Sequence, residues 1–254
     1  MLYTHAITRR PGENFHTGIT SAGLGLPRYR EALHQHDLYV KTLGACGLDV
    51  RVLEPDLRFP DGCFVEDTAV IIPEAGIITN PGAASRKGEE TSIASVLKKF
   101  MPLQTITSPG TMDGGDVLRV EKHFFVGLSG RTNGEGIEQF QRIVRPFGYV
   151  VTAVPLSNLL HLKSGIAYVG GNALVAVPEL INRPEFAGYT IYPIDPKEAY
   201  AVNCLRVDDK KLLIAAGFAK TKEAFIGRGE EVIEMEVSEF QKMDGGLTCL
   251  SLLF

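Results

Sequence analysis

One pattern recurs five times along this chain of 254 residues. Each copy combines a helical segment, a β-strand, a polar or reactive residue, and two short strands joined by a tight turn. The polar residues lie 46, 48, 42 and 46 positions apart and are Asp67, Asp113, His161, Asn203 and Cys249. A unit of this length cannot bury its own apolar face, so the copies must pack against one another. The repeat therefore predicts an α/β propeller of five blades arranged around an axis.

Turn and helix signals locate the individual copies. In the first copy a helical pattern runs through PRYREALHQHDLYVKTLGACG, DVRVLEP follows as a strand, and FVEDTAVIIPEAGIIT closes as a hairpin. Corresponding hairpins begin at DGGDVLRVEKHFFVGL, HLKSGIAYVGGNALVAV and NCLRVDDKKLLIAA, and the last copy ends in LTCLSLL. The N-terminal strand LYTHAIT would complete the blade left short at the C-terminus. We therefore expect a single catalytic domain over residues 1–254 with no linker.

Composition excludes several classes of protein. With 44% hydrophobic and 22% charged residues, the chain falls near the average for globular proteins. A formal charge of −4 with no basic stripe argues against binding of a nucleic-acid backbone. The apolar runs are far shorter than the roughly 18 residues of a membrane helix, and the first residues lack the pattern of a secretory signal. We therefore expect a cytoplasmic protein with no membrane partner.

Cysteine usage narrows the chemistry further. The four cysteines are far apart and include no CxxC pair, which argues against a zinc ribbon or a dithiol redox site. Cys249 lies in an apolar run five residues from the C-terminus, where packing alone would explain it. If equivalent positions of the blades converge, however, Cys249 shares a pocket with His161, Asp113 and Asp67. A thiol, an imidazole and carboxylates together make a nucleophilic site.

Each of these residues also has a structural interpretation. A single histidine in a strand-rich chain is usually a structural hydrogen-bonding residue. Asp113 and Asp116 could be turn residues, because Asp-Gly is a common turn signal. Glu66 and Asp67 could mark an exposed strand start, although strand alternation would point one of them inward. Two arginines taken alone are typical of a surface: Arg86 and Arg131.

Seven segments spread over nearly the whole chain carry a family resemblance. They are RFPDGCFVEDTAV (58–70), ITNPGAASR (78–86), DGGDVL (113–118), GLSGRTN (127–133), LLHLKSG (159–165), AVNC (201–204) and DGGLTCLS (244–251). Together they resemble the dimethylarginine dimethylaminohydrolases of the guanidino-group modifying enzyme superfamily, which includes amidinotransferases and arginine deiminases. The resemblance implies a five-bladed α/β propeller.

The resemblance also implies a set of site residues. Cys249 would be the nucleophile, His161 the general acid and base, and Asp113 the residue that orients the imidazole. Glu66 and Asp67 would hold the substrate guanidinium. The loop HTGITSAGLG (16–25) resembles the family's mobile lid. The remaining substrate contacts would be made by the side chains of Asp61, Arg86 and Arg131 to the amino-acid end, and by the backbones of Ile19 and Met243.

The implied reaction is the hydrolysis of asymmetric dimethylarginine or monomethylarginine to citrulline and dimethylamine or methylamine. A covalent thiouronium on the cysteine would be the intermediate. We expect no cofactor and no metal, because carboxylates can stabilise an electrophile that is already cationic. The expected partner is a small-molecule substrate, and a homodimer is one expectation for the assembly.

Two other functions stay open on these residues. Arginine deiminases share the propeller, but those relatives read His-x-Asp where this chain has Lys163 two residues after His161. The chain is also shorter than deiminases that carry an added helical domain. An inactive protein that binds arginine derivatives is the second alternative, although binding alone requires no nucleophile.

Overall fold

The computed structural model describes residues 3–254, which form two compact units. Unit 2 is the continuous segment Glu66–Pro196, and unit 1 combines the chain up to Val65 with Lys197–Phe254. Unit 2 contains three sheets and unit 1 contains two, each of three strands. The expectation of one domain over residues 1–254 stays a prediction.

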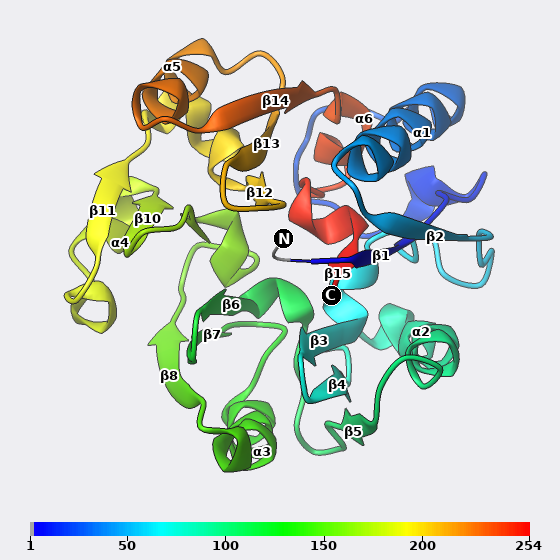
Figure 1. The fold of residues 1–254 in the computed structure, drawn as a ribbon. Coiled ribbons are helices and arrows are strands. Elements are labelled where there is room, and N and C mark those ends of the chain that lie inside the picture. Colours follow the sequence, from blue (N-terminus) through cyan, green and yellow to red (C-terminus); the bar gives the residue numbers. More distant parts are fainter. Residues whose placement is uncertain (1–2) are drawn as a thin grey trace. The chain divides into compact units, whose positions relative to one another are not determined.

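All five sheets have the same topology (Figure 1). In each sheet the middle strand pairs antiparallel with one neighbour, which is its hairpin partner in four of the sheets and the last strand of the chain in the fifth. It pairs parallel with the strand that follows the next helical segment. The middle strands are the most buried, since they are covered on both edges and both faces. This regularity confirms the fivefold repeat inferred from the sequence.

The three sheets of unit 2 follow one another along the chain. Two hairpins turn through Glu121 and Asn172, which adopt left-handed φ angles of 55° and 61°. Helix α3 is capped by Asn133, whose side chain accepts a hydrogen bond from the Gly136 N–H. The strands and helices are β3 (Ala69–Ile72), β4 (Ala75–Ile78), α2 (Glu89–Leu97), β5 (Leu103–Thr105), β6 (Val117–Val120), β7 (His123–Leu128), α3 (Gly134–Val144), β8 (Val150–Pro155), β9 (Ile166–Tyr168), β10 (Ala173–Ala176), α4 (Pro178–Ile181) and β11 (Thr190–Pro193).

Unit 1 joins the two ends of the chain in one sheet. Strand β1 lies between β15 and β2, and its Ala6 and Ile7 pair with Leu253 and Leu252 (Figure 1). This confirms that the N-terminal strand completes the last sheet. The strands and helices are β1 (His5–Arg9), α1 (Tyr29–Ala45), β2 (Asp49–Leu53), β12 (Leu205–Arg206), β13 (Lys211–Ala215), α5 (Ala219–Gly227), β14 (Glu231–Met235), α6 (Ser238–Gln241) and β15 (Leu252–Leu253).

A short 3-10 turn precedes the first hairpin strand of every sheet, and the five polar markers lie at these turns. Asp67 and Cys249 lie within two of these turns, and Asp113 and His161 are the N-cap residues of two others. Asn203 follows the 3-10 segment Pro196–Val202. The repeat therefore delivers one polar side chain to the same point of each sheet. In the described part of the chain, no helix is both long and apolar enough to cross a membrane.

Candidate active site

A histidine–aspartate pair forms the centre of the candidate site in unit 2. His161 Nε2 donates a hydrogen bond to Asp113 Oδ2 across 3.1 Å. Asp113 is fully buried and His161 is 7% exposed. Both residues have extended backbone where a 3-10 turn begins, so their side chains leave the backbone at equivalent points of adjacent repeats. This geometry can orient an imidazole for proton transfer.

Asp67 approaches the opposite edge of the same imidazole. Its Oδ1 lies 4.0 Å from His161 Nδ1 and accepts a hydrogen bond of 2.8 Å from the Gly115 N–H. A Cβ on Gly115 would lie 2.6 Å from His161 Nδ1 and 2.8 Å from Asp67 Oδ1. Only glycine leaves room for this approach, which explains the first of the two DGG segments physically.

The carboxylates hold His161 in its protonated form. Burial alone would lower the pKa of His161, but the charge of Asp67 and the hydrogen bond to Asp113 raise it to about 9. Burial likewise opposes ionisation of Asp67, and the charges of His161 and Arg86 outweigh it and lower its pKa to about 2. At neutral pH the site therefore presents an imidazolium, which is a proton donor, between two carboxylates.

Arg86 is buried beside Asp67. Its Nη1 contacts Asp67 Oδ2 at 2.5 Å, and its Nη2 contacts Glu89 Oε2 at 2.7 Å. Arg86 is 4% exposed, so it does not lie at the surface, where most arginine residues are found. Glu89, three residues further along, was not predicted from the sequence, although that spacing is a common one for ion pairs. A contact from Arg86 to the amino-acid end of a substrate stays a prediction.

Asp113 has further partners besides His161. Arg131 Nη1 lies 3.5 Å from Asp113 Oδ2, and the Gly82 N–H donates to Asp113 Oδ1 across 2.9 Å. The backbone N–H of Asp113 donates to Thr132 Oγ1 at 3.1 Å. Neighbouring segments therefore fix the carboxylate that holds the imidazole. The Arg131 side chain keeps 15% exposure, so part of it faces solvent.

Asp116, the second acid of the DGGD segment, is a supporting residue. It is fully buried and accepts hydrogen bonds from Ser129 Oγ, Thr132 Oγ1 and the Leu162 N–H at 2.6, 2.7 and 2.9 Å. Burial raises the pKa of Asp116, and the charge of His161 opposes the rise. Because Leu162 follows His161 directly, this carboxylate positions the backbone that carries the imidazole.

Glu66 and Asp67 lie in a 3-10 turn, Val65–Thr68, rather than in a strand. The expectation from strand alternation was therefore wrong, and both acids are buried, at 7% and 3% exposure. Glu66 forms an ion pair with Lys163, whose Nζ lies 2.6 Å from Glu66 Oε1. This pair joins the segment before Asp67 to the segment after His161.

Unit 1 contains Cys249 at its own 3-10 turn, Thr248–Leu250. The Gly246 N–H donates to Cys249 Sγ across 3.3 Å, a contact that favours the thiolate. Burial and the nearby charge of Cys249 raise the pKa of Tyr200, and the Tyr200 hydroxyl donates to the Gly245 carbonyl at 2.7 Å. Asn203, the fourth marker, donates to Thr248 Oγ1 at 3.1 Å and accepts the Thr248 N–H at 3.0 Å.

Close packing also explains the two glycines of the second DGG segment. A Cβ on Gly245 would lie 2.2 Å from the Phe64 ring, and one on Gly246 would lie 2.4 Å from Asn203 Oδ1. Asp244 has a left-handed φ of 57°. The preceding residue, Met243, is 2% exposed, and its N–H donates to the Phe240 carbonyl at 2.9 Å.

The loop 16–25 is tied down by acceptors from elsewhere in unit 1. The Ile19 N–H lies 3.1 and 3.2 Å from the two carboxylate oxygens of Asp61. Ser21 donates to Asp244 Oδ2 from both its N–H and its Oγ, and Thr20 Oγ1 donates to the Lys242 carbonyl. The structure therefore shows this loop held by hydrogen bonds to Asp61, Lys242 and Asp244. Asp244 was not predicted as a partner of the loop, since its only signal was its place in the DGG segment.

Asp67, Asp113 and His161 each offer one ligand atom within 4.8 Å of the others, a spacing that a metal ion could use. Both carboxylates already contact arginines, Arg86 and Arg131. Guanidinium groups therefore supply positive charge at these oxygens. That no metal takes part stays a prediction.

The predicted site residues fall into two sets. Six of them belong to unit 2: Glu66, Asp67, Arg86, Asp113, Arg131 and His161. The side chains of the last five form the connected network described above, and Glu66 pairs with Lys163. Four belong to unit 1: Ile19, Asp61, Met243 and Cys249. That Cys249 and His161 act on the same substrate stays a prediction.

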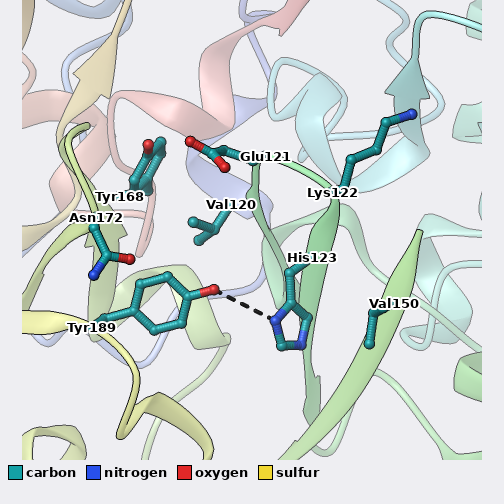
Figure 2. A pocket seen from close by; sticks show the side chains of 8 residues that line it. All are labelled: Val120, Glu121, Lys122, His123, Val150, Tyr168, Asn172 and Tyr189. Atoms are coloured by element: carbon teal, nitrogen blue, oxygen red, sulfur yellow. Dashed lines mark hydrogen bonds between the residues drawn. The ribbon is translucent and has the colours of Figure 1, made fainter. Parts of the chain in front are cut away.

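A separate cavity of about 270 Å³ lies on unit 2, at the β6–β7 and β9–β10 turns. In Figure 2 the Tyr189 hydroxyl points at His123 Nδ1, 3.4 Å away, while Lys122 points away from the two rings. The residues that line the cavity are Val120, Glu121, Lys122, His123, Val150, Tyr168, Asn172 and Tyr189. The predicted site residues are not among them.

Comparison with known proteins identifies the relatives of this chain. Residues 28–251 match the family model described as N,N dimethylarginine dimethylhydrolase, eukaryotic. The N(G),N(G)-dimethylarginine dimethylaminohydrolase of Pseudomonas aeruginosa is 41% identical over 100% of both chains. The enzyme of the same name from Streptomyces coelicolor is 34% identical, over 97% of this chain and 95% of its own.

A solved structure supports the same assignment. The Pseudomonas aeruginosa protein, crystallised as a cysteine-to-serine mutant complexed with citrulline, has a TM-score of 0.97 at 40% identity and covers 100% of both chains. Together with the five equivalent sheets, this similarity confirms the α/β propeller fold class.

Proposed function

Because the chain belongs to the dimethylarginine dimethylaminohydrolase family, whose members are hydrolases of carbon–nitrogen bonds in amidines, we propose that it converts Nω-methylated arginines to citrulline and a methylamine. Full-length similarity to an enzyme of this name, solved with citrulline, is the observation that carries the proposal. The buried pair of His161 and Asp113 supports it, because the reaction needs a proton donor at the leaving nitrogen.

In the first step Cys249 Sγ, as a thiolate, adds to the guanidinium carbon. His161, held as an imidazolium by Asp67 and Asp113, transfers a proton to the methylated nitrogen as its bond to carbon breaks. Dimethylamine or methylamine leaves, and the carbon remains bonded to sulfur as a thiouronium. The Gly246 N–H on Cys249 Sγ favours the attacking anion.

In the second step His161 is neutral and acts as a general base. It removes a proton from a water molecule, whose oxygen bonds to the thiouronium carbon. The bond from carbon to sulfur then breaks, which restores the Cys249 thiolate and releases citrulline. The second proton of the water leaves the product oxygen and is taken up by the released amine, which becomes an ammonium ion. His161 ends the cycle protonated, as it began, so protons and charge balance.

Substrate binding completes the proposal. The carboxylates of Glu66 and Asp67 hold the guanidinium through charge-assisted hydrogen bonds. The α-amino and carboxylate groups are bound by a second set of residues, which comprises Asp61, Arg86 and Arg131 through side chains, and Ile19 and Met243 through backbone.

Location and assembly belong to the same proposal. The four cysteines carry reduced thiols, which suits the reducing cytoplasm. The net charge of −4 disfavours a nucleic-acid partner. Cell fractionation tests the location, and light scattering tests the proposed homodimer.

The testing experiment measures citrulline released from asymmetric dimethylarginine, monomethylarginine and arginine. We expect turnover of the methylated substrates, no turnover by Cys249→Ser, and normal turnover by Cys46→Ala. Cys46 is a matched control because it is a buried thiol of unit 1 whose pKa is raised by burial. Faster turnover of arginine would indicate a deiminase, and no citrulline from any substrate would indicate a protein that only binds.

A further inference from the structure

The ion pair between Lys163 and Glu66 occupies an oxygen that the substrate would otherwise use. Lys163 Nζ lies 2.6 Å from Glu66 Oε1, and the two side chains are 17% and 10% exposed. From this geometry we infer that Lys163 is a specificity-determining residue, which favours methylated over unmethylated arginine by competing for Glu66. The inference rests on the proposed function, in which Glu66 and Asp67 hold the guanidinium.

The carboxylate oxygens of Glu66 and Asp67 already accept hydrogen bonds from other groups of the protein. Asp67 Oδ1 accepts from the Gly115 N–H, and Asp67 Oδ2 accepts from Arg86. Glu66 Oε1 accepts from Lys163. Three of the four carboxylate oxygens therefore receive a strong donor before any substrate arrives, and each of these donors takes one of the acceptor positions that a guanidinium could use.

Methylation changes how many acceptors a guanidinium requires. Unmethylated arginine presents N–H donors on every guanidinium nitrogen, whereas asymmetric dimethylation removes both donors from one terminal nitrogen. A donor that is buried without an acceptor weakens binding by roughly tenfold or more. Where acceptors are scarce, arginine suffers this loss and dimethylarginine does not.

The position of Lys163 makes it suited to this role. It lies in the 3-10 turn Leu162–Ser164, which starts directly after His161, and Glu66 directly precedes Asp67. The ion pair therefore links the turn that follows His161 to the turn that carries Asp67. The charge of Lys163 also repels any cationic substrate, but this repulsion is the same for both substrates and cancels in their ratio.

The test compares wild type with Lys163→Met and Lys163→Arg. Methionine keeps the apolar stem and removes the donor, while arginine still donates to Glu66. We expect the ratio of kcat/KM for dimethylarginine over arginine to fall about tenfold or more in Lys163→Met, since that is the loss assigned to one unmatched donor. In Lys163→Arg the ratio should stay within about threefold of wild type, because the donor is retained.

A purely structural role gives a different result. If Lys163 only stabilises the buried Glu66 carboxylate, both substrates lose kcat/KM in parallel and the ratio in Lys163→Met equals that of wild type. That outcome overturns the inference while wild-type turnover still upholds the proposed function.

A binding measurement distinguishes a failure of this inference from a failure of the proposed function. In the Cys249→Ser background, calorimetry with arginine and with dimethylarginine reports selectivity without turnover. An unchanged affinity ratio on adding Lys163→Met overturns the role of Lys163 even in an active enzyme. Wild type that releases no citrulline from methylated arginine overturns the proposed function and, with it, the inference.

Discussion

His161 and Asp113, 48 residues apart in sequence, lie 3.1 Å apart through Nε2 and Oδ2 and are both buried. They occupy equivalent positions in adjacent repeats, at the starts of two 3-10 turns. The pair is therefore a direct product of the repeat, and its surroundings determine its proton affinity.

Replacing Asp113 with asparagine should reduce kcat by about a hundredfold, the lower range for general acid–base catalysis. The variant keeps the shape of the side chain but removes the negative charge, and with it the charge-assisted hydrogen bond, that raise the pKa of His161. The alkaline limb of the pH profile of kcat should therefore move to lower pH. The exposed turn residue Asp209 supplies the control, as Asp209→Asn should behave like wild type. An unshifted limb in Asp113→Asn would show that Asp113 does not set this proton affinity.

Gly115→Ala should abolish most of the activity although it adds a single methyl group. The new Cβ would lie 2.6 Å from His161 Nδ1 and must displace the imidazole or Asp67. Overpacking of this kind costs about 1–3 kcal/mol of stability, so thermal unfolding is measured alongside citrulline release. Gly134→Ala is the matched control, since nothing lies within 4 Å of its added Cβ. Normal kcat in Gly115→Ala would show that catalysis does not require the close approach of Gly115 to His161 and Asp67.

Asp244→Gly should loosen the loop 16–25. It removes the acceptor of the two Ser21 hydrogen bonds while keeping a residue that tolerates the φ of 57°. Hydrogen bonds to a charged group contribute about 1.5–3 kcal/mol, so proteolytic cleavage of this loop should become at least about tenfold faster. Asp244→Asn retains an acceptor oxygen and should be cleaved at a rate closer to wild type. Equal cleavage rates of all three proteins would show that the hydrogen bonds from Ser21 to Asp244 do not hold the loop.

Acid should destabilise the protein through His36, a fully buried residue of α1. Burial lowers the pKa of His36 to about 4, with Asp37 opposing and Arg10 reinforcing the shift. Since the unfolded chain binds this proton near pH 6.5, the unfolding free energy should fall as pH drops from 6.5 to 4, by about 3 kcal/mol. His161 has the opposite sign, because its raised pKa stabilises the fold below pH 6.5 and this contribution is lost as pH rises through 9.

Chemical denaturation of wild type and His36→Leu between pH 7 and pH 4 isolates the His36 contribution. The slope of unfolding free energy against pH should be smaller in the variant, because leucine binds no proton. Identical slopes would assign the acid sensitivity to other groups.

Much of the site was accessible from the sequence because the repeat imposes it. The repeat spacing placed Asp113 and His161 at equivalent positions of neighbouring copies, and the family resemblance implied that Asp113 orients the imidazole. The two DGG segments could be recognised as sites of close approach, although glycine also serves ordinary turns. The atoms that approach Gly115, Gly245 and Gly246 could not be named, because they come from other repeats.

Burial of the charged residues could not be predicted. Arg86 looked like a surface residue, and its enclosure by Asp67 and Glu89 depends on a turn bringing two acids to one guanidinium. The position of Glu66 was misjudged because strand alternation was applied to a residue that lies in a 3-10 turn. Short turns have no strong periodicity, so local pattern does not reveal their burial.

The amino-acid sequence was sufficient for the repeat, the order of elements within each copy, and the family resemblance with its reactive residues, because periodicity and motifs are local properties of a chain. Which charges meet depends instead on the tertiary packing. Lys163 and Glu66 are 97 residues apart, and a long side chain can reach many partners, so the packing of the two turns selects this pair. The same holds for the proton affinity of His161, which depends on three carboxylates drawn together from distant positions.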